Sequence, residues 1–238
     1  MDAKDIDQLL GLGAGAFDHI PEYCRQEAID AIVQVRKLEQ ERLLRSGVYY
    51  VVLSDLSGAT AASAKLGMQL NVQRVESFIT VCVESLGRSE PKSYAQFVKP
   101  VGDAALFLFS SFADLYNWWN ETQSRMVFYS SEWNRKLSPE LRRVFQLRSK
   151  TVFHVGELEY SGGVDPAAAA VNQVFKIEKL FNPGELGCTE IARVIASPLF
   201  PDFSLQPKLR EEVTLPGMNE PMKTWVVAAN ELALVDLA

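Results

Sequence analysis

The chain has 238 residues, an apolar fraction of 47% and a formal net charge of −6, from 24 Lys and Arg against 30 Asp and Glu. This composition excludes wholesale disorder, and the acidic balance argues against a protein that binds nucleic acid by neutralising its phosphates. The longest apolar runs are about strand length, well short of the roughly 18 residues of a membrane span, and the acidic start MDAKDIDQLL is not a signal peptide, so we expect a soluble, cytoplasmic protein without a membrane partner.

Residues 1–47 are predicted to form a helical extension that is separate from the rest of the chain. Its apolar residues recur at helical spacing: Ile29, Ile32, Val33 and Leu38. This apolar stripe either packs on the body of the protein or pairs with its copy in a dimer, and the sequence does not choose between the two. Gly47 is predicted to end the extension.

Residues 48–238 are predicted to form one α+β domain. The apolar run at residues 48–54 is typical of a strand that is covered on both faces, and residues 94–101 and 104–109 are joined only by Gly102 and Asp103, which indicates a hairpin. The remaining helices are predicted around residues 61–66 and 72–86, over 112–128 with an irregular continuation to 147, over 167–181 and near 189–197, and the remaining strands over 150–160, 211–215 and 222–229. The order β-α-β-β-α-β is that of a ferredoxin-like core with additions.

The cysteines and histidines do not indicate a metal cluster or a disulfide framework. Cys24, Cys82 and Cys188 are far apart and form no CxxC or Cys/His pattern. We expect them to be small buried residues, and we expect His154, in a strand-like run, to be packed or hydrogen-bonded.

Two aspartates occupy unusual positions, because Asp55 ends an apolar strand and Asp103 lies in the turn between two apolar strands. In a β-α-β-β arrangement the first strand lies beside the hairpin, so the two carboxylates can converge at one edge of the sheet. Paired carboxylates of this kind hold the divalent cations that carry substrate phosphates. On spacing alone, Asp55 as a helix cap and Asp103 as a turn former remain an alternative.

The segment after Asp55 has the composition of a phosphate-binding loop. Leu56, Ser57, Gly58, Ala59 and Thr60 lie between a predicted strand and a predicted helix. Backbone N–H groups at a helix N-terminus can face a triphosphate, and glycine lets the ligand come close.

Four segments, in chain order, resemble the motifs of class III nucleotidyl cyclases. VVLSDLSGAT is similar to their FADISGFT metal-and-phosphate motif, and FVKPVGDAALFLF is similar to their K-x-I-G-D hairpin. TVFHVGELEYSGG looks like their GIHTG strand with the loop after it, and VNQVFKIEKLFNPGELGCTEI resembles VNxAxRLExxAxPGEIxxS. The resemblance covers roughly residues 48 to 227 and favours the metal-binding interpretation of Asp55 and Asp103.

The resemblance implies a catalytic domain that works as a homodimer with active sites at the interface. Asp55, Asp103 and the backbone carbonyl of Leu56 would hold two Mn²⁺ or Mg²⁺ ions. The loop after them, Ser57, Gly58, Ala59 and Thr60, would bind the phosphates of a nucleoside triphosphate.

The same resemblance assigns roles to residues that the partner chain would supply. Lys99 and Asp165 fall at the two base-reading positions of the family, and Asn172 matches the residue that orients the ribose. Lys176 falls at the position of the transition-state arginine. Tyr50, in the first predicted strand, is either a core residue or part of the base pocket, where a phenol ring would narrow the space for a purine.

The sequence also departs from the family pattern. Lys176 replaces an arginine and lacks its bidentate fork. The triphosphate-binding lysine of the family aligns near Met218, so that contact is absent or moved to Lys223, while Glu157 and Ala59 replace an arginine and a phenylalanine. The cations that could supply the missing charge are Arg148, Lys150 and Lys176.

The sequence therefore predicts a nucleotide cyclase that converts UTP to cUMP and pyrophosphate. A catalytic domain with only a short helical extension resembles the small uridylate and cytidylate cyclases of bacterial Pycsar anti-phage systems, whose product signals to a separate effector. Two alternatives remain: an adenylate cyclase, for which Lys99 and Asp165 argue, and a catalytically silent cyclase-like module for dimerisation or sensing. A diguanylate cyclase is disfavoured because the hairpin has no GGDEF-like sequence.

Overall fold

The computed structural model describes residues 47–158, 169–196, 207–214 and 221–229. The predicted N-terminal extension, except Gly47, lies outside the described residues, and so do Cys24 and Asp165. Within the described ranges, none of the helices combines the length and the apolar character that crossing a membrane requires.

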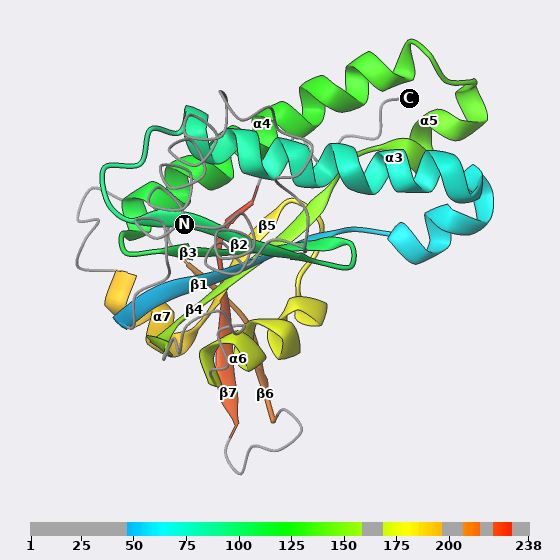
Figure 1. Cartoon of the computed structure of the whole chain (residues 1–238). Helices are drawn as coiled ribbons and strands as arrows, with labels where there is room; N and C mark the ends of the chain where they lie inside the picture. Colours follow the sequence, from blue (N-terminus) through cyan, green and yellow to red (C-terminus); the bar gives the residue numbers. More distant parts are fainter. Residues whose placement is uncertain (1–46, 159–168, 197–206, 215–220, 230–238) are drawn as a thin grey trace, which may run out of the picture. The chain divides into compact units, whose positions relative to one another are not determined.

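A seven-stranded sheet with the strand order β2-β3-β1-β4-β5-β7-β6 forms the centre of this part of the chain (Figure 1). The first four strands pair antiparallel, and helices connect β1 to β2 and β3 to β4, which confirms the predicted ferredoxin-like βαββαβ core. Their bounds are β1 Gly47–Leu56, β2 Ala95–Val101, β3 Ala104–Phe109 and β4 Ser149–Leu158.

Three further strands extend the sheet beyond β4. Strand β5 (Glu185–Thr189) pairs parallel with β4, β7 (Met222–Ala229) pairs antiparallel with β5, and β6 (Lys208–Val213) forms the edge. The sequence interpretation missed β5, because its five residues include a glycine and show no alternation of apolar and polar residues. Its strand conformation depends on pairing with β4, which a local pattern does not contain.

Five α-helices and one 3₁₀ helix connect the described strands. Helix α3 contains a break at Gly67, whose φ of 72° and ψ of 168° are not helical, and this break separates the two helical segments that the sequence predicts. The predicted irregular continuation after residue 128 is the end of α4 followed by the separate helix α5, which begins with a proline. The bounds are α3 Ala59–Arg88, α4 Phe112–Asn134, α5 Pro139–Phe145, α6 Ala169–Ile177, η1 Glu178–Leu180 and α7 Glu190–Ala196.

Helices α3 and α4 lie on one face of the sheet and α6 lies on the other (Figure 1). On the α4 side, the indole of Trp118 is fully buried, 4.5 Å from the ring of Phe107, and donates its N–H to the carbonyl of Cys82 on α3 at 2.9 Å. On the other face, α6 approaches β4 closely, since a Cβ atom on Gly156 would lie 2.6 Å from the Cβ of Ala170.

The two described cysteines and His154 have the surroundings that the sequence predicts. Cys82 and Cys188 are buried and unpaired, as expected for small apolar residues. The Nδ1 atom of His154 lies 2.8 Å from the hydroxyl of Thr189, so this histidine is hydrogen-bonded, as predicted.

Candidate active site

Asp55 and Asp103 meet at one edge of the sheet. Asp55 lies opposite Ala104 in the β1–β3 ladder, and the N–H of Leu56 donates to the carbonyl of Asp103 at 3.1 Å. Both aspartates are half-buried. Two residues that are 48 positions apart in the chain thus place their carboxyl groups at the ends of neighbouring strands.

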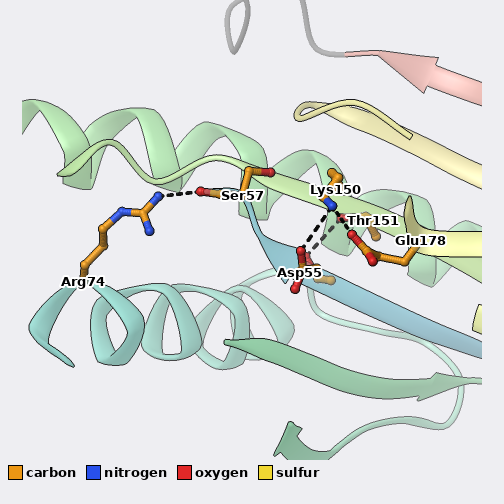
Figure 2. A network of polar contacts seen from close by, with 7 residues as sticks. Asp55, Ser57, Arg74, Lys150, Thr151 and Glu178 are labelled. Atoms are coloured by element: carbon orange, nitrogen blue, oxygen red, sulfur yellow. Dashed lines mark hydrogen bonds and ion pairs between the residues drawn. The ribbon is translucent and has the colours of Figure 1, made fainter. Parts of the chain in front are cut away.

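A cation of the chain itself joins this edge. The ammonium group of Lys150, which lies opposite Asp55 in the β1–β4 ladder, is 3.4 Å from the Oδ2 atom of Asp55 and forms an ion pair with Glu178 of η1. Figure 2 shows the three side chains pointing toward one another. Their side chains are 21%, 20% and 12% exposed for Asp55, Lys150 and Glu178, so these charges are poorly screened by water.

The charges around Asp55 are unbalanced. Burial is the largest cause that raises its pKa, the charge of Glu178 raises the pKa further, Lys150 lowers it, and Asp103 raises it, with the result that the pKa of Asp55 is about 7. Lys150 pairs with Asp55 and Glu178, while the charge of Asp103 acts on both Asp55 and the buried Arg74. Three carboxylates against two cations leave an excess of negative charge, which favours the binding of additional cations.

The residues at this edge fit divalent cations bound together with a phosphate. Mg²⁺ and Mn²⁺ prefer oxygen ligands, and Mg²⁺ is typically held by one or two carboxylates together with substrate phosphates. The described residues contain no group of three or more His, Cys, Asp or Glu side chains that could hold a metal ion without a substrate. Asp55 and Asp103 supply the pair of carboxylates that is needed to hold Mg²⁺ or Mn²⁺ together with substrate phosphates.

The loop after Asp55 leads directly into the N-terminus of α3. Gly58 precedes the helix with a φ of 73°, a conformation that suits glycine, and no side chain caps the helix. The first turn contains no acidic residue, so its N–H groups and the positive end of the helix dipole are available to an anion. Ser57 is fixed by its N–H, which donates to the carbonyl of Arg148 at 2.8 Å.

Two charged residues near this edge were not assigned by the sequence interpretation. Glu178 lies two residues after Lys176, inside the block that resembles VNxAxRLExx, but its pairing with Lys150 is a tertiary contact. Arg74 is 3% exposed and donates from Nη2 to the carbonyl of Ser57 at 2.7 Å (Figure 2). In the sequence, Arg74 falls at the four-residue spacing of the apolar residues Leu66, Leu70 and Phe78 along α3. A charged residue at such an apolar position is the signal that indicates a buried charge.

The residues predicted to act from a partner chain lie on two elements. Lys99 follows a register shift in β2 and lies opposite Leu106, which places it on the same face of the sheet as Asp55. Asn172 and Lys176 lie one turn apart on α6, which covers that face, and Asn172 is exposed. The structure leaves their roles as predictions, and Asp165 lies outside the described residues.

The structure does not bring Tyr50 to the candidate site. Side chains alternate along a strand, so Tyr50 points to the face opposite that of Asp55. Its ring packs 6.0 Å from that of Phe112 and 6.1 Å from that of Phe153, and the residue is 5% exposed. The core interpretation of Tyr50 therefore replaces its assignment to the base pocket.

Comparison with known proteins identifies the fold. No protein-family model and no curated protein sequence matches the chain. Among solved structures, it is similar to the guanylyl cyclase Cya2 at 18% identity, with a TM-score of 0.61 over 82% of this chain and 98% of the other. It is also similar to the adenylyl cyclase CyaB from P. aeruginosa, at 14% identity and a TM-score of 0.59 over 81% and 100% of the two chains.

An adenylate cyclase from Trypanosoma brucei shares the arrangement at 19% identity, with a TM-score of 0.56 over 77% of this chain and 92% of the other. The neighbours are adenylate and guanylate cyclase domains. The described residues thus have the α+β fold of a class III nucleotidyl cyclase domain. At these identities the likeness establishes the fold, and the chemistry has to be argued from the site.

Proposed function

We propose that this chain is a nucleotidyl cyclase, which converts a nucleoside triphosphate to its 3′,5′-cyclic monophosphate and pyrophosphate. The observation that carries the proposal is the meeting of Asp55 and Asp103 at one sheet edge, directly before a loop that begins a helix. The carboxylates suit divalent cations and the loop suits phosphates. The cyclase fold of the structural neighbours supports the same reaction class.

In this reaction the 3′-oxygen of the ribose attacks the α-phosphorus, the bond from this phosphorus to the bridging oxygen breaks, and the 3′-hydroxyl loses its proton. Two Mn²⁺ or Mg²⁺ ions held by Asp55, Asp103 and the carbonyl of Leu56 would lower the pKa of that hydroxyl and neutralise the departing pyrophosphate. The loop of Ser57, Gly58, Ala59 and Thr60 would bind the phosphates through its N–H groups.

Lys150 would supply charge that the departures from the family pattern remove. Its ammonium group is already at the site, 3.4 Å from the carboxylate of Asp55, and turning toward a bound triphosphate would exchange its ion pairs with Asp55 and Glu178 for contacts with the phosphates. As a point charge it can stabilise developing negative charge on the phosphates, although without the paired hydrogen bonds of an arginine.

The other half of the site would come from a second copy of the chain. On α6, Asn172 would orient the ribose and Lys176 would place its charge at the transition state. Lys99 and Asp165 would read the base. A homodimer with two active sites at its interface is therefore part of the proposal.

The substrate we propose is UTP, and the product cUMP would act on a separate effector in anti-phage defence. The support is the set of departures from the adenylate and guanylate cyclase pattern, above all Lys176 in place of arginine and the loss of the triphosphate lysine near Met218. Adenylate cyclase activity is the alternative, for which Lys99 and Asp165 argue, because they fall at the two base-reading positions of the family.

Incubation of the purified chain with ATP, GTP, CTP and UTP, each with Mn²⁺, tests this proposal when the products are separated by mass. We expect cUMP as the main product and a loss of at least a hundredfold in Asp103→Asn, whereas the exposed surface variant Glu132→Gln should retain activity. Exclusive formation of cAMP would remove the UTP assignment but keep the cyclase. Absence of a cyclic product from all four substrates would overturn the cyclase itself.

One observation favours a second candidate, a catalytically silent domain that binds nucleotide or dimerises. In the structure an internal ammonium group already bridges Asp55 and Glu178, an arrangement that could replace a metal ion rather than give way to it. A silent domain predicts that Mn²⁺ does not strengthen the binding of a non-cyclisable UTP analogue in calorimetry, either to the wild-type chain or to Asp55→Asn.

A further inference from the structure

A cavity of about 430 Å³ lies where the strands from β4 to β6 meet the helices α6 and α7. The nine described residues that line it come from the four strands β4, β5, β6 and β7, from both helices and from the residue directly before β7. Sites for small molecules in proteins have volumes of about 300 to 1,000 Å³, so the cavity is large enough for a ligand of modest size.

The cavity is separate from the carboxylates of the candidate active site. In the β1–β4 ladder Lys150 lies opposite Asp55, and His154, which lines the cavity, follows Lys150 four residues later on β4. Four residues of a strand span about 13 Å and return to the same face of the sheet. None of the described residues to which the proposed reaction assigns a role lines the cavity.

Three lining residues that are buried or half-buried carry polar groups: His154, Gln173 and Thr189. The hydroxyl of Thr189 lies 2.8 Å from the Nδ1 atom of His154 and accepts the N–H of Ala192 at 3.4 Å, so it orients the imidazole. Burial lowers the pKa of His154, which keeps the ring neutral at pH 7 and leaves Nε2 as the nitrogen that a ligand can bond. The amide of Gln173 adds a donor and an acceptor beside it.

Apolar side chains line the same cavity. Ile191 at the start of α7 is 58% exposed, Met222 is half-buried and Pro221 is exposed. Apolar walls with a few hydrogen-bonding groups suit a flat heteroaromatic ring, whose faces pack against apolar atoms and whose edge carries donors and acceptors. Nucleobases are recognised in this way when they lie outside a base stack.

The charges at the cavity limit what such a ring can carry. Two carboxylates and one ammonium group line it, from Glu190, Glu212 and Lys223. Glu190 is paired with Arg193 at 2.8 Å, and Glu212 lies opposite Lys223 in the β6–β7 ladder. These described residues offer no excess of positive charge, which disfavours a triphosphate. The exposed Lys223 can balance a single negative charge.

We propose that this cavity binds a nucleoside or a cyclic mononucleotide, with the base against His154 and Gln173. The two ligands share a base and a ribose and differ by one phosphodiester charge, which would lie near Lys223. Gln173 directly follows Asn172 on α6, so an occupied cavity would act on the helix that supplies the other half of the active site. Cyclic mononucleotides are the product class of the cyclase, so control of the enzyme by its product through this cavity rests on the proposed function.

The test is calorimetry on the full chain in EDTA, which prevents turnover, with cUMP, cCMP, cAMP, cGMP and the four corresponding nucleosides as ligands. We expect at least one of them to bind, and Ile191→Trp, whose larger ring would fill the cavity, to weaken this binding at least tenfold. Ile195→Trp is the matched control, because Ile195 is an exposed isoleucine of α7 that does not line the cavity. This control and the active-site variant Asn172→Ala should both bind like the wild type.

Lys223→Gln distinguishes the two kinds of ligand. A several-fold weaker affinity for the cyclic mononucleotide, with an unchanged affinity for its nucleoside, assigns the cavity to the cyclic form. Equal affinities for both in the wild type assign it to the nucleoside.

The proposal would be overturned if the wild type bound none of the eight ligands at millimolar concentration, or if the folded Ile191→Trp variant bound them equally well. Loss of binding in Asn172→Ala but not in Ile191→Trp would place the ligand in the active site and would also overturn it. Binding at the cavity by a chain that makes no cyclic product would overturn only the proposed function, whereas turnover without such binding would overturn only this inference.

Discussion

At Asp55, burial and two neighbouring carboxylates act against a single ammonium group. The pKa of Asp55 is therefore raised to about 7, far above its usual value of 3.8. A carboxyl group with a raised pKa holds its proton more tightly in the folded state than in the unfolded state. Below about pH 4, Asp55 is protonated in both the folded and the unfolded state, and its contribution to the stability of the fold is at its maximum. This contribution is lost as the pH rises toward 7.

We therefore expect the stability of the metal-free chain to fall as the pH rises from 4 to 7 through the contribution of Asp55. The measurement is chemical unfolding in EDTA at several pH values, with Asp55→Asn as the control that removes the titrating group. The difference in stability between the two proteins should change with pH in this window and level off above 7. A difference that stays constant would contradict the raised pKa.

The same residues show how far the sequence alone leads to the site. Asp55 and Asp103 could be selected because an acidic residue directly after an apolar strand is unusual, and the hairpin placed them at one edge. Glu178 could not, since a charged residue in a helix looks like a solvated one until its burial and its partners are known, and Arg74 carries only the weak signal of a charge at an apolar position of α3. Tyr50 and Asp55 are an odd number of positions apart on β1, so the alternation of side chains along a strand places them on opposite faces and separates Tyr50 from the site.

Among the elements, α3 and α4 form the layer that supports the strands of the site. Trp118 on α4 packs against β3 through Phe107 and Phe109 and binds the backbone of α3 through its indole N–H. One side chain thus connects both helices to β3, the strand that begins directly after Asp103. Its removal leaves a cavity and frees the carbonyl of Cys82.

Trp118→Ala is expected to lower the free energy of unfolding by about 3 to 5 kcal/mol. The matched control is Phe128→Ala on the same helix, where a 62% exposed ring is removed and a change of less than about 0.5 kcal/mol is expected. Urea unfolding followed by circular dichroism measures both. Equal effects of the two substitutions would show that the layer does not depend on the indole.

The strands differ in how well their sequences predicted them. Strand β1 and the hairpin of β2 and β3 were found because their apolar runs are continuous and the turn contains only Gly102 and Asp103. Strand β5 was missed, and α5 appeared only as an irregular continuation of α4. Short elements of five to seven residues take their structure from the sheet or helix they pack on, and a local pattern records this weakly.

For the whole molecule, the proposal requires two copies of the chain. Asp55 and Asp103 would belong to one half of each active site, and Asn172 and Lys176 on α6 to the other half. In a twofold dimer each active site combines the carboxylates of one chain with α6 of the other chain. A dimer of two chains that carry substitutions in different halves therefore contains one intact site.

Mixing Asp103→Asn with Asn172→Ala tests this arrangement. Each variant alone should be inactive or nearly so, and random exchange of subunits should restore about a quarter of the wild-type activity, because about half of the dimers would contain one intact site of two. The cyclic product is measured before and after mixing. Activity that does not rise after subunit exchange would contradict a site shared between chains.

The central claim is that Asp55 and Asp103 bind divalent cations around a triphosphate. A crystal structure of the chain with Mn²⁺ and a non-cyclisable UTP analogue, with the ions located by anomalous scattering, tests it most directly. We predict two Mn²⁺ peaks within coordination distance of both carboxylates, with Lys150 no longer paired to Asp55. Nucleotide bound without Mn²⁺ at these carboxylates, and with Lys150 still bridging Asp55 and Glu178, would contradict the claim.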